Sequence, residues 1–114
     1  MKKALALIAI LVAAQVFAAD NPAPLPKSAV HRYLVERTFP PNALKGLDSA
    51  TKKKVNANNR SVGVRWVRSY ANADETKTFC IYEGPSESAI REAAKINKLP
   101  VDSITEIPVT LSPK

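Results

Sequence analysis

Five side chains of this sequence are considered as ligands for a transition metal. They are one imidazole, one thiol and three carboxylates: His31, Cys80, Glu36, Glu83 and Glu106. Zinc and similar divalent metals prefer imidazole and thiolate ligands, and carboxylates complete their coordination shells. The chain has no His-x-His, Cys-x-x-Cys or His-Glu-x-x-His spacing, so the fold must bring any ligands together. The candidate metal ligands are Glu36, Cys80 and His31.

A second group of side chains is suited to a pocket for a small organic or anionic ligand. Arginines pair with anions, and aromatic rings form apolar walls. The candidate pocket residues are Arg65, Trp66, Arg68, Tyr70, Tyr82 and Glu106. The ordinary alternative is that the rings pack in a core or an interface, and that Arg65 or Arg68 neutralises Glu36 in a structural ion pair.

The single cysteine and the single histidine also have ordinary explanations. Cys80 lies between Phe79 and Ile81, where a free cysteine usually packs as a small buried hydrophobic residue. His31 lies at the start of the domain and fits a surface position. A cysteine nucleophile would need a base that only His31 could supply, and no serine-histidine-acid set is present. The sequence therefore favours a binding protein over an enzyme, with a cofactor-free monooxygenase as a third possibility.

The N-terminus has the pattern of an export signal. Two lysines precede an apolar run from Ala4 to Phe17, and small residues precede an expected cleavage after Ala18. The run is shorter than a typical membrane-spanning helix, so we expect no stable membrane anchor and a periplasmic or secreted protein. The chain divides into a signal peptide (1–18), an extended proline-rich lead-in (19–29), one domain (30–111) and a tail (112–114).

The mature chain is basic. Removing Lys2 and Lys3 from the formal charge of +7 leaves +5. A basic surplus is typical of nucleic-acid binding in a cytosolic protein, but export makes that function unlikely to apply here. We therefore expect no nucleic-acid partner, and we interpret the lysine run 52–54 as the solvated face of a helix.

The apolar periodicity predicts six elements in the order strand, helix, strand, strand, helix, strand. The two helices can cover only one face of a four-stranded antiparallel sheet, which gives the split βαβ, or ferredoxin-like, α+β fold. The first helix carries the apolar stripe Leu44, Leu47, Thr51 and Val55. The predicted elements are strand 31–37, helix 41–58, strands 62–71 and 77–83, helix 85–98 and strand 102–111.

Alternation in the second strand predicts which side chains share a face of the sheet. Val64, Trp66, Arg68 and Tyr70 should lie on one face, with Arg65, Val67 and Ser69 on the other. An open sheet face with aromatic residues needs cover, so we expect a homodimer that packs sheet against sheet.

Four blocks of the sequence resemble a small bacterial domain family, formerly of unknown function and described as nickel-binding after one characterised member. They are YLVERTFP (33–40), VGVRWVRSY (62–70), KTFCIYEGPS (77–86) and AIREAAKINKLPVDSITEI (89–107). The resemblance implies a ferredoxin-like fold, dimerisation and binding of nickel or another divalent metal. Relatives often have histidine where this chain has Arg68, whose protonated guanidinium cannot be a ligand.

Together these observations favour an exported, dimeric binding protein for a divalent metal, nickel by resemblance, at a site on the sheet face. The alternative keeps the fold and the dimer but replaces the metal with a small organic or anionic ligand.

Overall fold

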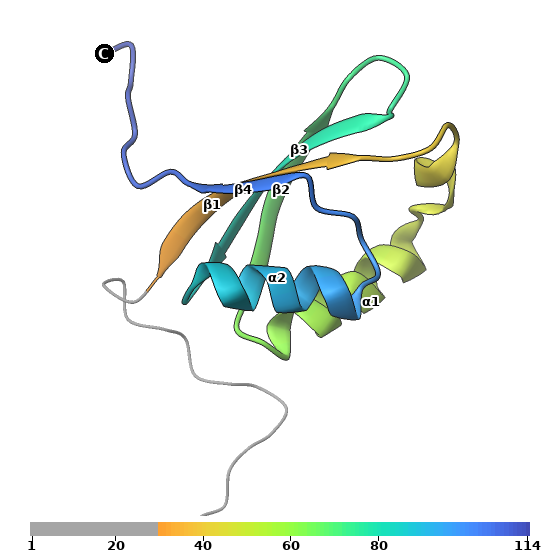
Figure 1. Cartoon of the computed structure of the whole chain (residues 1–114), viewed down its shortest axis with the longest axis horizontal. Coiled ribbons are helices and arrows are strands. Elements are labelled where there is room, and N and C mark those ends of the chain that lie inside the picture. Colours follow the sequence, from red (N-terminus) through yellow and green to blue (C-terminus); the bar gives the residue numbers. More distant parts are fainter. Residues whose placement is uncertain (1–29) are drawn as a thin grey trace, which may run out of the picture.

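A computed structural model describes residues 30–114. The predicted signal peptide (1–18) and lead-in (19–29) lie outside the described residues. The elements in chain order are β1 (His31–Thr38), the 3₁₀ helix η2 (Ala43–Gly46), α1 (Ser49–Arg60), β2 (Arg65–Ala71), β3 (Lys77–Gly84), α2 (Glu87–Ile96) and β4 (Ser103–Glu106) (Figure 1).

The four strands form one antiparallel sheet in the order β2-β3-β1-β4. Helices α1 and α2 lie on the same side of this sheet and leave its other side open (Figure 1). The central strands β1 and β3 pair along their full length, from His31 opposite Gly84 to Thr38 opposite Lys77. The predicted ferredoxin-like fold is confirmed.

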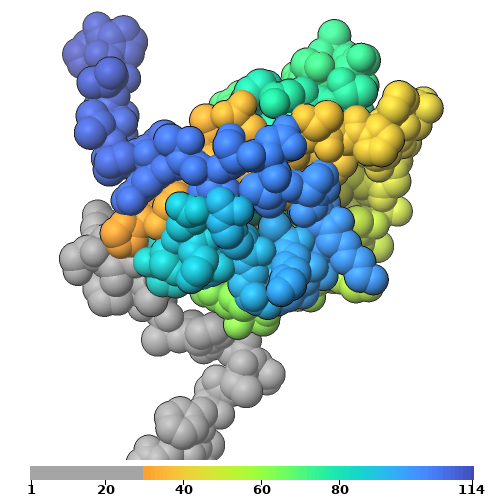
Figure 2. Space-filling model, viewed as in Figure 1, coloured from red at the N-terminus to blue at the C-terminus, as the bar shows by residue number. Residues whose placement is uncertain are grey.

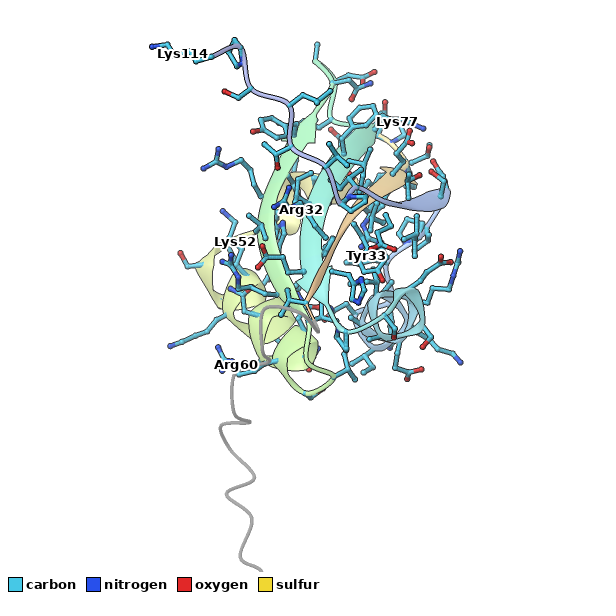
Figure 3. All side chains as sticks on the ribbon, turned by 90° about the vertical axis from the view of Figure 1, so that its left-hand side faces the viewer. Arg32, Tyr33, Lys52, Arg60, Lys77 and Lys114 are labelled. Atoms are coloured by element: carbon cyan, nitrogen blue, oxygen red, sulfur yellow. The ribbon has the colours of Figure 1, made fainter. Side chains whose placement is uncertain are left out.

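Alternation along the two central strands separates a helix-covered face from an open face. Tyr33 and Val35 of β1, with Cys80 and Tyr82 of β3, are buried under the helices. Figure 3 shows Arg32 and Tyr33 on opposite sides of β1. Helix α2 contributes the buried side chains Ile90, Ala93 and Ala94. Because the two alanines are short, α2 packs closely on the sheet.

Gly84 at the end of β3 permits this close packing. A Cβ atom at this position would lie 3.2 Å from Cδ1 of Ile90 and 3.2 Å from Cγ2 of Val64. Both neighbours are buried, so neither has room to move aside. The glycine therefore lets the sheet, α2 and the start of β2 meet at one point.

Both α-helices begin at a side-chain cap. The carboxylate of Asp48 accepts a hydrogen bond from the backbone N–H of Thr51 at 2.8 Å, and the hydroxyl of Ser86 accepts one from Ala89 at 3.2 Å. Such caps satisfy N–H groups that have no partner inside the helix. No helix within residues 30–114 is long and apolar enough to cross a membrane.

The predicted helix over 41–58 is divided in the structure. Asn42 has a positive φ of 69°, which a continuous helix does not allow, and η2 follows it. Helix α1 begins only after Asp48 and continues to Arg60, past the predicted end. The prediction missed the boundary because Asp48 acts as a cap. The segment around η2 projects at one end of the molecule (Figure 2).

Strand β2 contains a bulge that the alternation did not predict. The register shifts between Trp66 and Arg68, so Val67 is an additional residue. Trp66 lies opposite Tyr82 on the helix-covered face, whereas Arg68 lies opposite Ile81 on the open face. The prediction that Trp66 and Arg68 share a face is wrong, because one inserted residue reverses the alternation.

The last strand is shorter than predicted. β4 ends at Glu106, whereas the pattern predicted a strand over 102–111. One further backbone bond follows, from the N–H of Ile107 to the carbonyl of Arg32 at 2.9 Å. Pro108 then has no N–H to donate, and β4 is an edge strand as that proline indicates.

Replacing Ile90 by alanine should strongly destabilise the fold. Ile90 is 1% exposed, so its truncation should lower the free energy of unfolding by about 2–5 kcal/mol. Ile96→Ala, on the same helix but 39% exposed, should cost about 1 kcal/mol or less. Urea denaturation followed by tryptophan fluorescence measures both. Equal losses would contradict the packing of α2 through its Ile90 face.

Candidate functional site

The structure does not bring the three candidate metal ligands together. Glu36 lies on the open face, where its carboxylate is 3.8 Å from the ammonium of Lys77 and accepts a bond from Ser103 at 3.1 Å. Cys80 is buried on the opposite face, opposite Val35. The pleat separates them. Cys80 lies on the same face as its partner Val35, and the side chains of Val35 and Glu36 point to opposite faces. Within residues 30–114, no group of three or more His, Cys, Asp or Glu side chains could hold a metal ion.

The third candidate, His31, forms a pair with Glu106. Its Nδ1 lies 2.8 Å from Oε2 of Glu106, joining the start of β1 to the end of β4. Both side chains are about two-fifths exposed. Burial raises the pKa of the neighbouring Tyr33, and the negative charges of Glu106 and Glu87 raise it further. The pair offers two metal ligands, fewer than the three that protein sites for such metals usually provide, so one chain does not form a complete site.

The six predicted pocket residues are divided between two faces. Arg65 pairs with Glu83 on the open face at 3.0 Å. Arg68 is exposed on the same face, and Glu106 lies at the far edge of the sheet. Trp66 and Tyr82 line a pocket on the helix side of the sheet. Tyr70 also borders this pocket, but it lies opposite Phe79 and its exposed side chain belongs to the open face. The six residues therefore do not surround one site within a single chain.

This pocket lies between the sheet and the segment formed by η2 and α1. Its volume is about 560 Å³, and it is partly open to solvent. The stripe predicted to pack α1 on the sheet lines it instead, namely Leu44, Leu47, Thr51 and Val55. The only buried side chain of α1 is Asn59, so this helix closes the core far less tightly than α2 does. A cavity remains where a helix of more apolar composition would fill the space.

The indole of Trp66 is fixed at the pocket wall. Its Nε1 donates to the hydroxyl of Ser69 at 2.8 Å, three residues along the same strand. Both residues line the pocket, and the bulge in β2 puts Ser69 on the same face as Trp66. Because Trp66 is the single tryptophan of the chain, its fluorescence reports on this pocket alone.

Arg37 is a pocket residue that the sequence analysis did not select. Its side chain is 2% exposed, yet it lines the pocket. One guanidinium nitrogen donates to the carbonyl of Pro100 at 2.6 Å and another to the hydroxyl of Tyr82 at 3.2 Å. The guanidinium carbon lies 5.6 Å from the centre of the Tyr82 ring, a cation–π distance. The alternation of β1 was the available signal, since it puts Arg37 on the same face as Tyr33 and Val35.

No carboxylate forms an ion pair with Arg37 in the part of the chain that the structure describes. The charge of Arg37 acts on the carboxylate of Asp102, but that carboxylate has other partners. Hydrogen bonds from Thr38 and then from Lys77 lower the pKa of Asp102, with the charge of Arg37 as the weakest contribution. Asp102 is therefore ionised at neutral pH, and its bonds to Thr38 and Lys77 hold it at the open face of the sheet.

The phenol of Tyr82 stays protonated beside this cation. Burial raises its pKa, and the nearby positive charge of Arg37 offsets only part of that effect. Its oxygen accepts a hydrogen bond from Arg37, while its own proton has no acceptor among residues 30–114. Thr78, also buried and lining the pocket, accepts the weak hydrogen bond of the Cys80 thiol at 3.5 Å. Arg37, Tyr82 and Thr78 thus form a polar end in an otherwise apolar pocket.

These features define a small α+β protein of ferredoxin-like fold with a ligand-sized pocket between its sheet and one helix. Residues 33–107 match the family described as "Nickel responsive protein SCO4226-like", and the chain belongs to this family. The resemblance to a bacterial family associated with nickel is confirmed.

The fold is similar to the crystal structure of SCO4226 from Streptomyces coelicolor A3(2). The TM-score is 0.52 with 17% sequence identity, and the match covers 70% of this chain and 99% of that chain. At this identity the likeness shows a shared fold and no more. No curated protein matches the chain.

Proposed function

We propose that this protein is an exported binding protein that holds a small, largely apolar organic molecule in the pocket between its sheet and α1. The pocket itself carries this proposal. Its volume of about 560 Å³ falls within the range of roughly 300 to 1,000 Å³ that is usual for small-molecule sites. Mostly apolar walls with a few converging polar groups are also typical of such sites.

The apolar lining supports a function because an empty apolar pocket reduces stability. Leu44, Leu47 and Val55 are each only partly buried, although they face the sheet side of the molecule. A chain of this size has a small core and gains from burying every available apolar side chain. Helix α1 does not cover these side chains completely. A bound apolar molecule would cover them and remove them from water.

A test of this function uses Trp66 as the reporter. Saturable quenching or a spectral shift of its fluorescence is expected when phenylbutyrate is added to the mature chain. Gly46→Phe should weaken this binding by about tenfold or more, because the ring occupies part of the pocket. Gly46 lines the pocket, and a Cβ there would meet no other atom within 4 Å, so the variant should fold.

The matched control is Ala50→Phe, which adds the same ring to an exposed position of α1 outside the pocket lining. It should bind the probe as the parent does. Absence of any saturable fluorescence change with phenylbutyrate or octanoate would contradict the proposal. A change in sedimentation of Gly46→Phe, with probe binding intact, would instead make a second copy of the chain the occupant of the pocket.

The proposal includes the form of the mature protein, which is an exported homodimer. The export pattern of residues 1–18 supports the first part. The open sheet face supports the second, because Leu34, Phe79 and Ile81 adjoin one another there and Tyr70 is 57% exposed beside them. Packing two such faces together would cover these side chains.

Protein purified from the envelope fraction of a bacterial host should begin at Ala19 and sediment with twice the chain mass. Phe79→Lys should yield a monomer, because it places a charge among the apolar side chains of the open face. Ser88→Lys, on the exposed side of α2, should remain a dimer. A monomeric parent protein would contradict the proposed dimer. A purified protein that still carries residues 1–18 would contradict export with cleavage.

Divalent metal, nickel in particular, is the second candidate ligand. Membership of a nickel-responsive family favours it, as does the His31–Glu106 pair with its imidazole and carboxylate donors. Because this pair offers only two ligands, a second copy of the chain would have to supply the others. This candidate therefore moves the metal from the predicted sheet-face site to the β1–β4 edge.

Calorimetric titration of the mature chain with Ni²⁺ tests this candidate. His31→Ala should abolish the heat of binding and Glu106→Gln should weaken affinity by about tenfold, because each removes a ligand. Glu36→Ala and Cys80→Ser serve as controls and should bind as the parent does. Loss of binding in either control would return the metal to the sheet, and heats no larger than dilution would exclude nickel binding.

A further inference from the structure

We infer that the ligand of this pocket is a small organic carboxylate whose anionic group binds at the polar end formed by Arg37, Tyr82 and Thr78. The inference rests on the proposed pocket function and names the class of ligand. It is carried by the burial of Arg37, by the unused donors around it and by the apolar character of the remaining walls.

Arg37 carries an unbalanced charge inside the fold. Arg37 is 2% exposed, and an arginine remains protonated at any ordinary pH. A buried charge is costly unless it is paired with an opposite charge or fully hydrogen-bonded. Within residues 30–114 Arg37 has a carbonyl, a phenol and a ring as neighbours, but no carboxylate in an ion pair. A ligand carboxylate would supply that missing charge.

Arg37 and its neighbours also have hydrogen-bond donors that remain available to a ligand. A guanidinium has five N–H donors, and the bonds to Pro100 and Tyr82 engage two of its nitrogens. The Tyr82 hydroxyl accepts one of these bonds, so its own proton is available, and the Thr78 hydroxyl accepts from Cys80 in the same way. A carboxylate is an acceptor only, with two oxygens, and is complementary to such a group of donors.

Charged and apolar side chains occupy different parts of the pocket. Its charged lining residues are Arg37, Lys52 and Glu75, so basic groups outnumber acidic ones. Away from Arg37 the walls are apolar and come mainly from the η2 segment, α1 and the sheet: Phe39, Ala43, Leu44, Leu47, Val55 and Trp66. The ligand that fits both parts is a monocarboxylate with an aromatic or branched aliphatic body.

A purely structural role for Arg37 makes a different prediction. Its bond to Pro100 at 2.6 Å ties the segment after α2 to β1, which would account for the residue without any ligand. In that case the pocket would bind an acid and its neutral amide equally well. The comparison of these two probes therefore separates the two roles in the unaltered protein.

The experiment measures the affinity of the mature chain for phenylbutyrate and for phenylbutyramide by Trp66 fluorescence. The acid should bind about tenfold or more tightly than the amide, because hydrogen bonds to a charged partner are stronger than neutral ones. Equal affinities would overturn this inference and leave the pocket function standing. Binding of neither probe would contradict the pocket function itself.

Two arginine variants complete the test. Arg37→Met should reduce the preference for the acid to near equality with the amide, while Arg68→Met, on the open face, should keep the full preference. If Arg37→Met does not fold, Tyr82→Phe removes one donor hydroxyl and should lower the acid preference by a few-fold. A preference lost in Arg68→Met but kept in Tyr82→Phe would place the anion on the open face and overturn the assignment.

Discussion

The buried guanidinium of Arg37 is the constraint on which the rest of the site depends. It holds the Pro100 carbonyl, and so fixes the segment that leads from α2 into β4. It also engages the Tyr82 hydroxyl and lies over the edge of the pocket. A charge in this position is tolerated only when donors and acceptors around it are well arranged, so it imposes order on three separate segments of the chain.

The two helices contribute unequally to the packing of the core. Helix α2 places Ile90 and two alanines in the core and packs closely on the sheet, helped by Gly84. Helix α1 has a largely polar sequence and leaves its few apolar side chains around a cavity. Stability thus comes mainly from α2 and the central strands, which frees the α1 side of the sheet for binding.

Family membership favours a metal ligand, whereas the geometry of the described residues favours an organic one. The metal-binding residue types are present, but the pleat and the strand order disperse them over two faces and one edge. The pocket, by contrast, is formed within one chain. A shared fold does not by itself transfer a ligand, because ferredoxin-like scaffolds support unrelated sites.

The sequence by itself determined the order of elements, the antiparallel sheet with helices on one face, and the burial of Cys80. These follow from local periodicity and from the limited number of ways to cover a four-stranded sheet. Tertiary structure decided which residues meet. The bulge at Val67 moved Arg68 away from Trp66 to the open face, the Asp48 cap shortened α1, and a pocket remains beside Arg37. A one-residue shift in register and an incompletely filled volume are properties of packing between distant segments, which periodicity along the chain does not contain.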